Sequence, residues 1–171
     1  MTRLDRKQSI QLRKQVENRK EKEKAIVERL LPFLDKDKKI GAYIPIQGEV
    51  DVYSYLKDRY TMYVPKVISE TEMQFCKDTH LQLGKFQIPE PDIQDAIEPE
   101  ELDILLIPMV AFDYPYRRGY GKGYYDRYLK KCPALRIGIA FDIQQTSLQA
   151  RPWDENMDWI ITETRTIGGN P

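Results

Sequence analysis

The stretch LDILLIPMVAFDYPYRRGYGKGYYDRYL, residues 102–129, joins an apolar run to a loop with three glycines. Residues 102–112 are almost continuously apolar, as in a strand that is buried on both faces of a parallel sheet. Beyond the glycines, apolar side chains recur at helical spacing, which predicts a helix with one apolar face. That face is formed by Tyr124, Tyr125, Tyr128 and Leu129. We therefore expect the glycines to lie between a buried strand and a helix N-terminus.

The sequence on both sides of this stretch alternates short β-rich runs with helical segments. The predicted strands are 40–46, 61–68, 72–78, 135–141 and 159–164. A helix is predicted at 52–60, where Asp51 can act as the cap. Because strands joined by a helical crossover run parallel, the chain is predicted to form an α/β domain with a mainly parallel sheet and helices on both faces. Its 171 residues suit a single domain, 1–171.

The N-terminal region is predicted to be helical. Residues 10–34 contain no glycine and are rich in Glu, Lys, Arg and Gln, so we expect one long helix or two abutting ones. The middle part, ENRKEKEK, is charged on all sides, which is typical of a solvated face. Four basic residues near its start remain candidates for binding an anion: Arg6, Lys7, Arg13 and Lys14. Residues 72–100 are less regular and are expected to include an ordered surface loop.

Composition excludes several classes of protein. Lys plus Arg and Asp plus Glu both number 27, so the chain lacks the basic excess of a dedicated nucleic-acid binder. No apolar run approaches the roughly 18 residues that span a bilayer, and no signal-peptide core is seen at the N-terminus. Cys76 and Cys132 have no zinc-type or redox spacing, which suits free thiols in a reducing compartment. We expect a soluble, cytoplasmic protein without nucleic-acid or membrane partners.

The glycine loop admits three interpretations: a phosphate cradle that opens a helix, a nucleic-acid patch, or a solvated turn. Ligands in open α/β sheets bind beyond the carboxyl ends of the strands, where this loop is expected. Its backbone amides, together with Arg117 and Lys122, would favour a phosphate. The loop is neither a nucleotide P-loop, because no Ser or Thr follows the lysine, nor a dinucleotide fingerprint. The plain turn remains an alternative.

Other candidate residues also have two readings. Asp126 falls on the first helical turn, where it is either a partner of the helix dipole or a Mg²⁺ ligand beside a polyphosphate. Glu49 is either an exposed turn residue or a hydrogen-bonding group that faces a substrate. Tyr124 is better placed than the other helix tyrosines to face the cleft. His80 is expected at the surface, without a catalytic triad. The lack of an evident nucleophile and base fits phosphoryl transfer, which relies on positioning and charge.

The sequence resembles the 5-formyltetrahydrofolate cyclo-ligase family in seven motifs, which occur in this order: LR in the first helix, QGEVD, VPK, GKFQIPEP, LDILLIPMVAFD, RRGYGKGYYDRYL and MDWIITE. The most specific motif is GKGYYDRYL behind a buried strand that ends in AFD. The resemblance covers nearly the whole chain. It implies a single three-layer α/β cyclo-ligase domain, similar to ribose-phosphate isomerases and CoA transferases.

The resemblance also implies a reaction. ATP phosphorylates the formyl oxygen of 5-formyltetrahydrofolate, the nitrogen at position 10 attacks the activated carbon, and phosphate leaves. The products are 5,10-methenyltetrahydrofolate, ADP and phosphate. ATP and Mg²⁺ are the implied cofactors, the folate is the implied small-molecule partner, and the enzyme is expected to be a monomer.

Individual residues carry implied roles. The ATP-binding residues would be Arg13, Arg117, Arg118, Gly119, Tyr120, Gly121, Lys122, Gly123, Tyr124 and Asp126. Of these, Lys122, Arg117 and Tyr124 would be catalytic. Asp126 and Asp158 would hold Mg²⁺. The folate would contact Glu49, Phe86 and Tyr124.

The chain departs from the family pattern at three places. Ser9 stands where a basic residue usually precedes the arginine of the first helix, which leaves Arg6 or Lys7 to substitute. Tyr120 stands where arginine is common. RPWDENMD replaces a segment that commonly carries Glu-Pro-His-Asp, which puts Arg151 and Trp153 at the edge of the expected nucleotide pocket. Two rival interpretations stay open: a sugar-phosphate or CoA-handling enzyme of the same architecture, and an RNA-binding module built on residues 117–131.

Overall fold

The computed structural model describes residues 3–84 and 87–169, and its centre is an eight-stranded sheet. The strand order is β12-β11-β10-β7-β1-β2-β3-β6. These strands are β1 (Ile40–Gly41), β2 (Met62–Val67), β3 (Met73–Lys77), β6 (Ala96–Ile97), β7 (Ile104–Pro108), β10 (Leu135–Ile139), β11 (Trp159–Ile161) and β12 (Thr166–Gly168). From β11 to β2 all neighbours pair in parallel, whereas β12, β3 and β6 add antiparallel strands at the two edges. The predicted mainly parallel sheet is confirmed.

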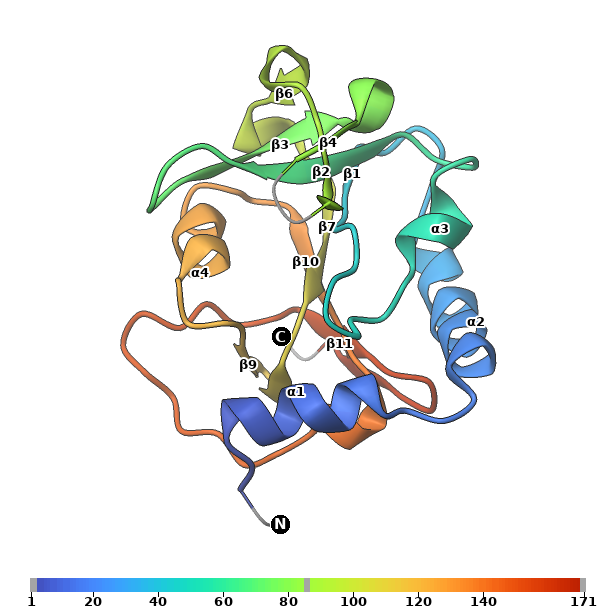
Figure 1. The fold of residues 1–171 in the computed structure, drawn as a ribbon, viewed down its shortest axis with the longest axis vertical. Coiled ribbons are helices and arrows are strands. Elements are labelled where there is room, and N and C mark those ends of the chain that lie inside the picture. Colours follow the sequence, from blue (N-terminus) through green and yellow to red (C-terminus); the bar gives the residue numbers. More distant parts are fainter. Residues whose placement is uncertain (1–2, 85–86, 170–171) are drawn as a thin grey trace.

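Helices cover both faces of the sheet and form the outer two of three layers. α2 (Arg19–Leu30) and α3 (Tyr53–Leu56) lie on one side, and α4 (Tyr124–Leu129) lies on the other (Figure 1). In β7, alternate residues point to opposite faces. Ile104 and Leu106 therefore pack with α2 and α3, while Leu105 and Ile107 pack with α4. The three-layer α/β prediction is confirmed.

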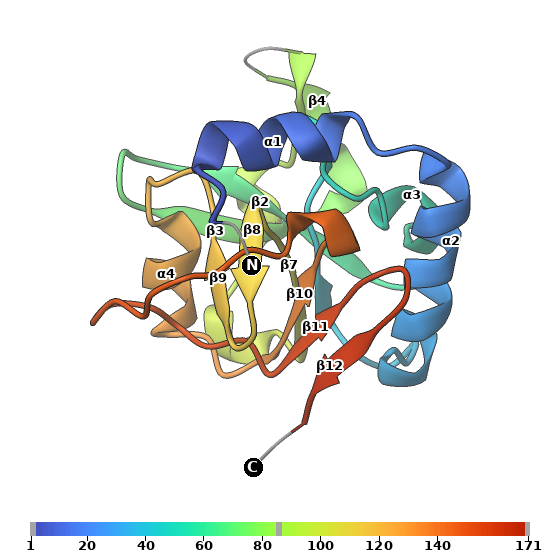
Figure 2. The ribbon, with the colours of Figure 1, turned by 90° about the horizontal axis from the view of Figure 1, so that it is seen from below.

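α1 (Arg6–Lys14) belongs to neither layer and crosses one end of the sheet (Figure 2). Its Arg13 donates to the carbonyl of Met109, just beyond the carboxyl end of β7. The predicted helix over residues 10–34 is thus two helices, separated by a turn at which Asn18 has a φ of 53°. This break allows α1 to lie across the strand ends while α2 packs on the face.

The apolar run at 102–112 is not one strand, which corrects the sequence prediction. β7 ends at Pro108, and the chain then forms a separate antiparallel hairpin from β8 (Ala111–Asp113) and β9 (Tyr116–Arg118). The run reads as continuous because the start of β8 is buried as deeply as β7. The glycine loop consequently follows a hairpin rather than the buried strand itself.

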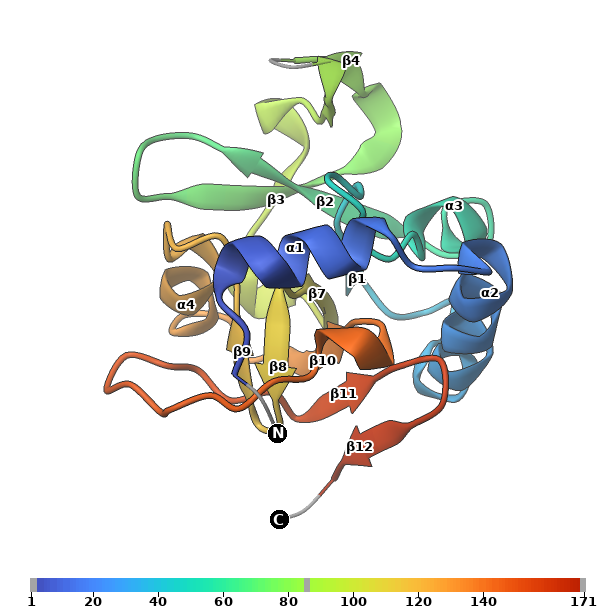
Figure 3. The same cartoon turned by 60° about the horizontal axis from the view of Figure 1, so that its bottom comes forward.

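The remaining predictions differ from the structure mainly in length. Only Ile40–Gly41 of residues 40–46 is paired as a strand, and α3 is a single turn at which Asp51 accepts the N–H of Ser54, as expected of a cap. Within the less regular segment, β4 (Gln82–Leu83) and β5 (Pro89–Glu90) form a small hairpin that projects beyond β2 and β3 (Figure 3). Among the described residues, no helix combines the length and the apolar character needed to cross a membrane.

Candidate active site

A cavity of about 460 Å³ opens at the carboxyl ends of β1, β2 and β7. Its walls are the turn after β1, the end of β2, the segment after β7 and the glycine loop. This is the edge of the sheet at which a ligand was expected from the parallel topology. The end of β10, with Phe141 and Asp142, was also expected there, but neither residue lines the cavity.

The glycine loop has a backbone that only glycine adopts easily. Gly121 has a φ of 95° and Gly123 a φ of 73°, both in the left-handed region. Arg6 Nε donates to the carbonyl of Gly119 over 2.9 Å, and Arg127 Nη2 donates to the carbonyl of Lys122 over 2.7 Å. These bonds tie two loop carbonyls to arginines that flank the loop.

The N–H groups of the same loop are left available. In residues 3–84 and 87–169, the N–H groups of Gly121, Lys122 and Gly123 donate no hydrogen bond to a protein acceptor. The exposed side chain of Lys122 lines the cavity beside them. Free amides next to an ammonium group suit an oxyanion, so the loop has the composition of a phosphate cradle.

Arg13 does not reach this cradle, contrary to the expectation from the resemblance. Its side chain is wholly buried and does not line the cavity. Its guanidinium donates to the carbonyls of Gln47 and Met109 over 2.9 and 3.0 Å, and to the hydroxyl of Tyr120 over 2.6 Å. The structure therefore makes Arg13 a support inside the protein.

Arg6 takes the place that was expected of Arg13. It lies two turns earlier on the same face of α1, lines the cavity and binds the loop carbonyl of Gly119. Ser9, between the two arginines, is wholly buried, and Lys7 does not line the cavity. Of the two substitutes left open by the sequence, the structure thus brings Arg6 to the loop.

Glu49 lies in the cavity wall opposite the loop and is not an exposed turn residue. The residue is only 6% exposed. One carboxylate oxygen, Oε1, accepts the N–H of Ile46 over 2.9 Å, and the other, Oε2, accepts the hydroxyl of Tyr120 over 3.4 Å. Burial raises the pKa of Glu49, although the Ile46 N–H and the nearby Arg13 charge oppose that rise. A buried carboxylate that lines a cavity is suited to accept N–H groups of a ligand.

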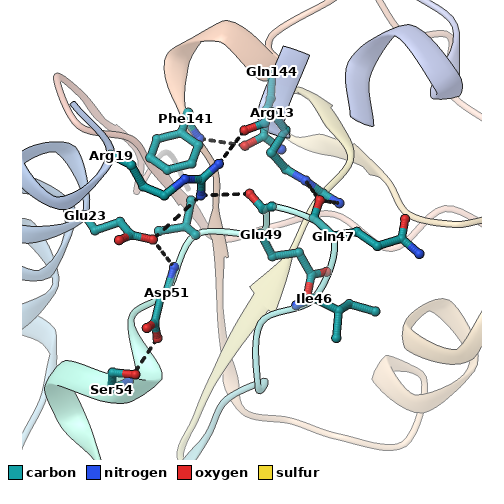
Figure 4. A network of polar contacts seen from close by, with 12 residues as sticks. Arg13, Arg19, Glu23, Ile46, Gln47, Glu49, Asp51, Ser54, Phe141 and Gln144 are labelled. Atoms are coloured by element: carbon teal, nitrogen blue, oxygen red, sulfur yellow. Dashed lines mark hydrogen bonds and ion pairs between the residues drawn. The ribbon is translucent and has the colours of Figure 1, made fainter. Parts of the chain in front are cut away.

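The turn that carries Glu49 is braced by a polar network from the N-terminal helices (Figure 4). Arg19 donates to the carbonyls of Gly48 and Arg13 over 3.0 and 2.6 Å. Glu23, one turn further along α2, accepts the N–H of Asp51 over 2.6 Å. With the bonds from Arg13 to Gln47, this network fixes both ends of the turn.

Arg117 and Arg118 lie on opposite sides of β9, because successive residues of a strand alternate. Arg117 lines the cavity, is 7% exposed and donates to the carbonyl of Pro108 over 2.8 Å. Its Nε has no partner among the described residues, and burial lowers its pKa. Arg118 points away, pairs with Asp154 over 3.3 Å and does not line the cavity. Arg118 instead lines a second hollow, together with Arg6 and Arg151, so its contact with ATP stays a prediction.

The two aspartates expected to share Mg²⁺ lie at different ends of the sheet. Asp126 lines the cavity. Asp158 directly precedes β11, at the amino ends of the parallel strands, and its carboxylate accepts the N–H of Arg136 over 2.8 Å. Parallel strands place their starts and ends at opposite edges, so Asp158 cannot join Asp126 in this arrangement. No group of three or more His, Cys, Asp or Glu residues able to hold a metal is found in the described part of the chain.

The remaining expected contacts are divided between the cavity and its surroundings. Gly119, Tyr120 and Tyr124 line the cavity, and the Tyr124 hydroxyl donates to the carbonyl of Ser69 over 3.1 Å. Phe86 lies outside the described residues. His80 is exposed and pairs with Asp95 over 2.8 Å, as its surface prediction implied.

Several lining residues were not predicted as site residues. Lys66, at the end of β2, faces Glu90 of β5 across 3.5 Å, and both line the cavity. Lys66 could have been found from its position at a strand end, whereas Glu90 gave no local signal. Arg151 lies over the ring of Trp153 at 5.3 Å, and both line the rim, as the departure in RPWDENMD suggested.

The cavity thus offers cations and free amides on one side and a buried carboxylate on the other. None of the described lining residues is a serine, threonine, cysteine or histidine. The cations, amides and carboxylates that line the cavity can bind and orient a ligand and stabilise charge on it.

Comparison with known proteins gives consistent matches over most of the chain. The sequence model of the 5-formyltetrahydrofolate cyclo-ligase family matches residues 3–163. A 5-formyltetrahydrofolate cyclo-ligase of Mycoplasma pneumoniae is 36% identical over 149 residues, which cover 81% of this chain and 82% of the relative. The corresponding protein of Escherichia coli K12 is 27% identical over 142 residues, which cover 74% and 78%.

Two solved structures are also similar. A 5,10-methenyltetrahydrofolate synthetase from Mycoplasma pneumoniae superposes with a TM-score of 0.76 at 35% identity, covering 92% of this chain and 96% of its own. The NMR structure of 5,10-methenyltetrahydrofolate synthetase from Aquifex aeolicus gives a TM-score of 0.81 at 32% identity, covering 94% and 89%.

Proposed function

The chain belongs to the 5-formyltetrahydrofolate cyclo-ligase family and is an enzyme of that family, and from this premise we propose that it converts 5-formyltetrahydrofolate to 5,10-methenyltetrahydrofolate with ATP. ADP and phosphate are the other products. The observation that carries the proposal is the pairing, in one cavity, of an amide-and-lysine cradle at residues 121–123 with the buried carboxylate of Glu49.

The reaction makes a poor leaving group into a good one. The formyl oxygen attacks the γ-phosphorus of ATP, and ADP leaves. The nitrogen at position 10 then attacks the activated formyl carbon and loses its proton, and the carbon–oxygen bond breaks as phosphate departs. No protein nucleophile takes part, in keeping with a cavity wall without serine, cysteine or histidine among its described residues.

We assign the phosphates of ATP to the glycine-loop side. Lys122 Nζ and the free loop amides would stabilise the charge that develops on the transferred phosphoryl group. Arg117 would add a fixed positive charge, because it is held to the carbonyl of Pro108 while its Nε is unpartnered among the described residues. Arg6 and Arg151 line both this cavity and a second hollow of about 490 Å³, which supports a nucleotide that extends along them.

The residues present fit a Mg²⁺ ion that is held mainly by the phosphates. This ion prefers one or two carboxylates together with phosphate oxygens and water. Asp126 lines the cavity, and within the described residues its carboxylate acts on Arg117 through its charge and makes no hydrogen bond or close ion pair. We assign Mg²⁺ binding to Asp126 alone, with the ion neutralising phosphate charge when bound. The Asp158 carboxylate instead accepts the N–H of Arg136 near the start of β10.

We assign the folate to the opposite side of the cavity. Glu49 would accept N–H groups of the pterin ring, and the apolar wall formed by Met73, Ile88 and Pro89 would cover the ring. Tyr124 would border the formyl group, and the contact of Phe86 with the folate remains part of the proposal. We further propose that the enzyme acts as a monomer in the cytoplasm, which suits two buried free thiols.

The test is to mix protein, ATP, Mg²⁺ and 5-formyltetrahydrofolate and to follow the absorbance of the methenyl product and the release of ADP. Both signals should require all four components. Asp126→Asn should weaken the dependence on Mg²⁺ and lower the rate without unfolding the protein. Full activity of that variant in saturating EDTA would exclude the metal assignment.

Two other outcomes would exclude the whole proposal. Binding of sugar phosphates or CoA without ATP turnover would indicate a phosphate-binding enzyme of another kind. Salt-sensitive RNA binding, with no nucleotide hydrolysis on any folate, would indicate that residues 117–131 form an RNA-binding surface.

A further inference from the structure

Tyr120 occupies a position between the two walls of the cavity. It belongs to the glycine loop, yet its hydroxyl lies between Arg13 and Glu49 on the opposite side. Arg13 Nη2 donates to the hydroxyl over 2.6 Å, and the hydroxyl donates to Glu49 Oε2 over 3.4 Å. The side chain also lines the cavity. It is the one described loop side chain that hydrogen-bonds to the Glu49 carboxylate.

The direction of these two bonds follows from the chemistry of arginine. A guanidinium has donors only, so the Tyr120 oxygen must accept from Arg13 and its proton is free for Glu49. Arg13 is itself held by the carbonyls of Gln47 and Met109, and its guanidinium lies 5.6 Å from the centre of the Tyr120 ring. The buried arginine therefore orients the hydroxyl toward the carboxylate.

Resting on the proposed function, we propose that Tyr120 is the positioning residue of Glu49: oriented by Arg13, its hydroxyl holds the carboxylate in the geometry that receives the N–H groups of the reduced folate. The main chain of Ile46 holds one oxygen, and Tyr120 holds the other. Tyr120 acts through Glu49 and makes no bond in the reaction. Its side chain also links the glycine loop to the turn that carries Glu49.

If the Tyr120 side chain only filled space, removing its hydroxyl would leave the titration of Glu49 unchanged, whereas loss of a hydrogen bond to the carboxylate raises the Glu49 pKa. Burial raises the Glu49 pKa, and the Tyr120 hydroxyl is one of the groups that oppose the rise. The other charged or titratable groups acting on Glu49 are Arg13, Arg117, Tyr43 and Tyr125. Burial raises the pKa of both of these tyrosines, and it raises that of Tyr120 to about 12. In weak acid, Glu49 is therefore the group in this set that titrates.

The kinetic experiment compares Tyr120→Phe with Tyr114→Phe. Both substitutions remove one hydroxyl and keep the ring, but Tyr114 donates to the carbonyl of Asp158 outside the cavity. We expect Tyr120→Phe to raise the KM for 5-formyltetrahydrofolate about fivefold to tenfold, since a long hydrogen bond to a charged group contributes at the low end of its range. The KM for ATP and the melting temperature should barely change, and the acidic limb of kcat/KM should move to higher pH. Tyr114→Phe should match the wild type.

A second measurement needs no turnover. Titration of the ¹³C-labelled Glu49 carboxyl by NMR in the ligand-free protein should give a higher pKa in Tyr120→Phe than in the wild type. If the wild type proved inactive on folates, the proposed function would fail while this titration still tested the positioning role. An unchanged Glu49 titration, or equal increases in KM for ATP and folate, would overturn the inference.

Discussion

The turn at residues 46–51 and the glycine loop at residues 119–123 are two walls of one cavity, and they are held by opposite means. Side chains of the N-terminal helices brace the turn: the buried Arg13 and the half-buried Arg19 bind its carbonyls, and the buried Glu23 binds its N–H at Asp51 (Figure 4). The loop is exposed over most of its length and is tied to Arg6 and Arg127, both at the surface.

The difference corresponds to what each wall presents to a ligand. The turn presents a carboxylate, which must be desolvated yet kept in one orientation, so it needs a rigid interior support. The loop presents backbone amides and one flexible lysine, so its carbonyls have to be turned away and its amides left open. We therefore expect substitutions in the bracing of the turn to reduce stability, and substitutions in the loop to reduce activity.

The largest effect is expected at Lys122, on the loop side. Lys122→Met keeps the length of the side chain and removes its charge. Loss of a donor that stabilises the transferred phosphoryl group should lower kcat about 10²- to 10³-fold, while the melting temperature stays within a few degrees because the side chain is exposed. Steady-state kinetics at saturating ATP and folate test this. A wild-type kcat with only a higher KM for ATP would make Lys122 a ground-state binder.

The turn side should respond in stability. Arg13→Met removes the donor of the Gln47 carbonyl and one of the two donors of the Met109 carbonyl, which keeps its bond from Gln144 Nε2. We expect the free energy of unfolding to fall by about 1 to 3 kcal/mol. Urea denaturation measures the change. Lys14→Met, one residue along the same helix but exposed, is the matched control and should change little. Equal stability of Arg13→Met and wild type would show that the network does not brace the turn.

A smaller effect distinguishes the two basic residues at the start of α1. Arg6→Gln should raise the KM for ATP about twofold to fivefold, because an exposed charge contributes roughly 0.2 to 1 kcal/mol. Lys7→Gln, at the neighbouring position outside the cavity, should leave it unchanged. The Arg6 effect should also shrink at high salt. Equal responses of the two variants would mean that neither residue is specific for the nucleotide.

The smallest effect concerns the pH dependence of stability at Glu49. Because burial raises its folded-state pKa above 4.5, Glu49 stabilises the fold below pH 4.5, and that contribution is lost as the pH rises through the folded pKa. Glu49→Gln does not titrate, so it should gain stability relative to the wild type between pH 4 and pH 7. Unfolding measurements at both pH values test the sign, and a relative loss at pH 7 would contradict it.

Much of the fold followed from local patterns in the sequence. Alternating apolar runs and helical segments predicted the parallel strands β1, β2, β7, β10 and β11, and the glycine spacing predicted a loop before α4. These features are local because hydrophobic period and backbone freedom are properties of short segments. Because the strands are parallel, a ligand site could be predicted at their carboxyl ends without knowing where any side chain points.

The hairpin of β8 and β9 was missed because its apolar residues continue those of β7 without a polar break. β12 was missed as well, because three residues are too few to show the alternation of apolar and polar side chains that predicts a strand. Both elements are defined by the partner they pair with, which a single-sequence pattern does not contain.

By itself, then, the sequence determined the α/β class, the position of the glycine loop before a helix and the family to which the chain is similar. Where two residues of the same type were both candidates for the site, only the tertiary structure decided which of them faces the cavity. Arg6 and Arg13 share one face of α1, yet the first reaches the loop and the second is wholly buried. Asp126 lies near the carboxyl ends of the parallel strands, and Asp158 lies at their amino ends. Packing makes these choices, because the direction and burial of a side chain depend on contacts with segments far away in the sequence.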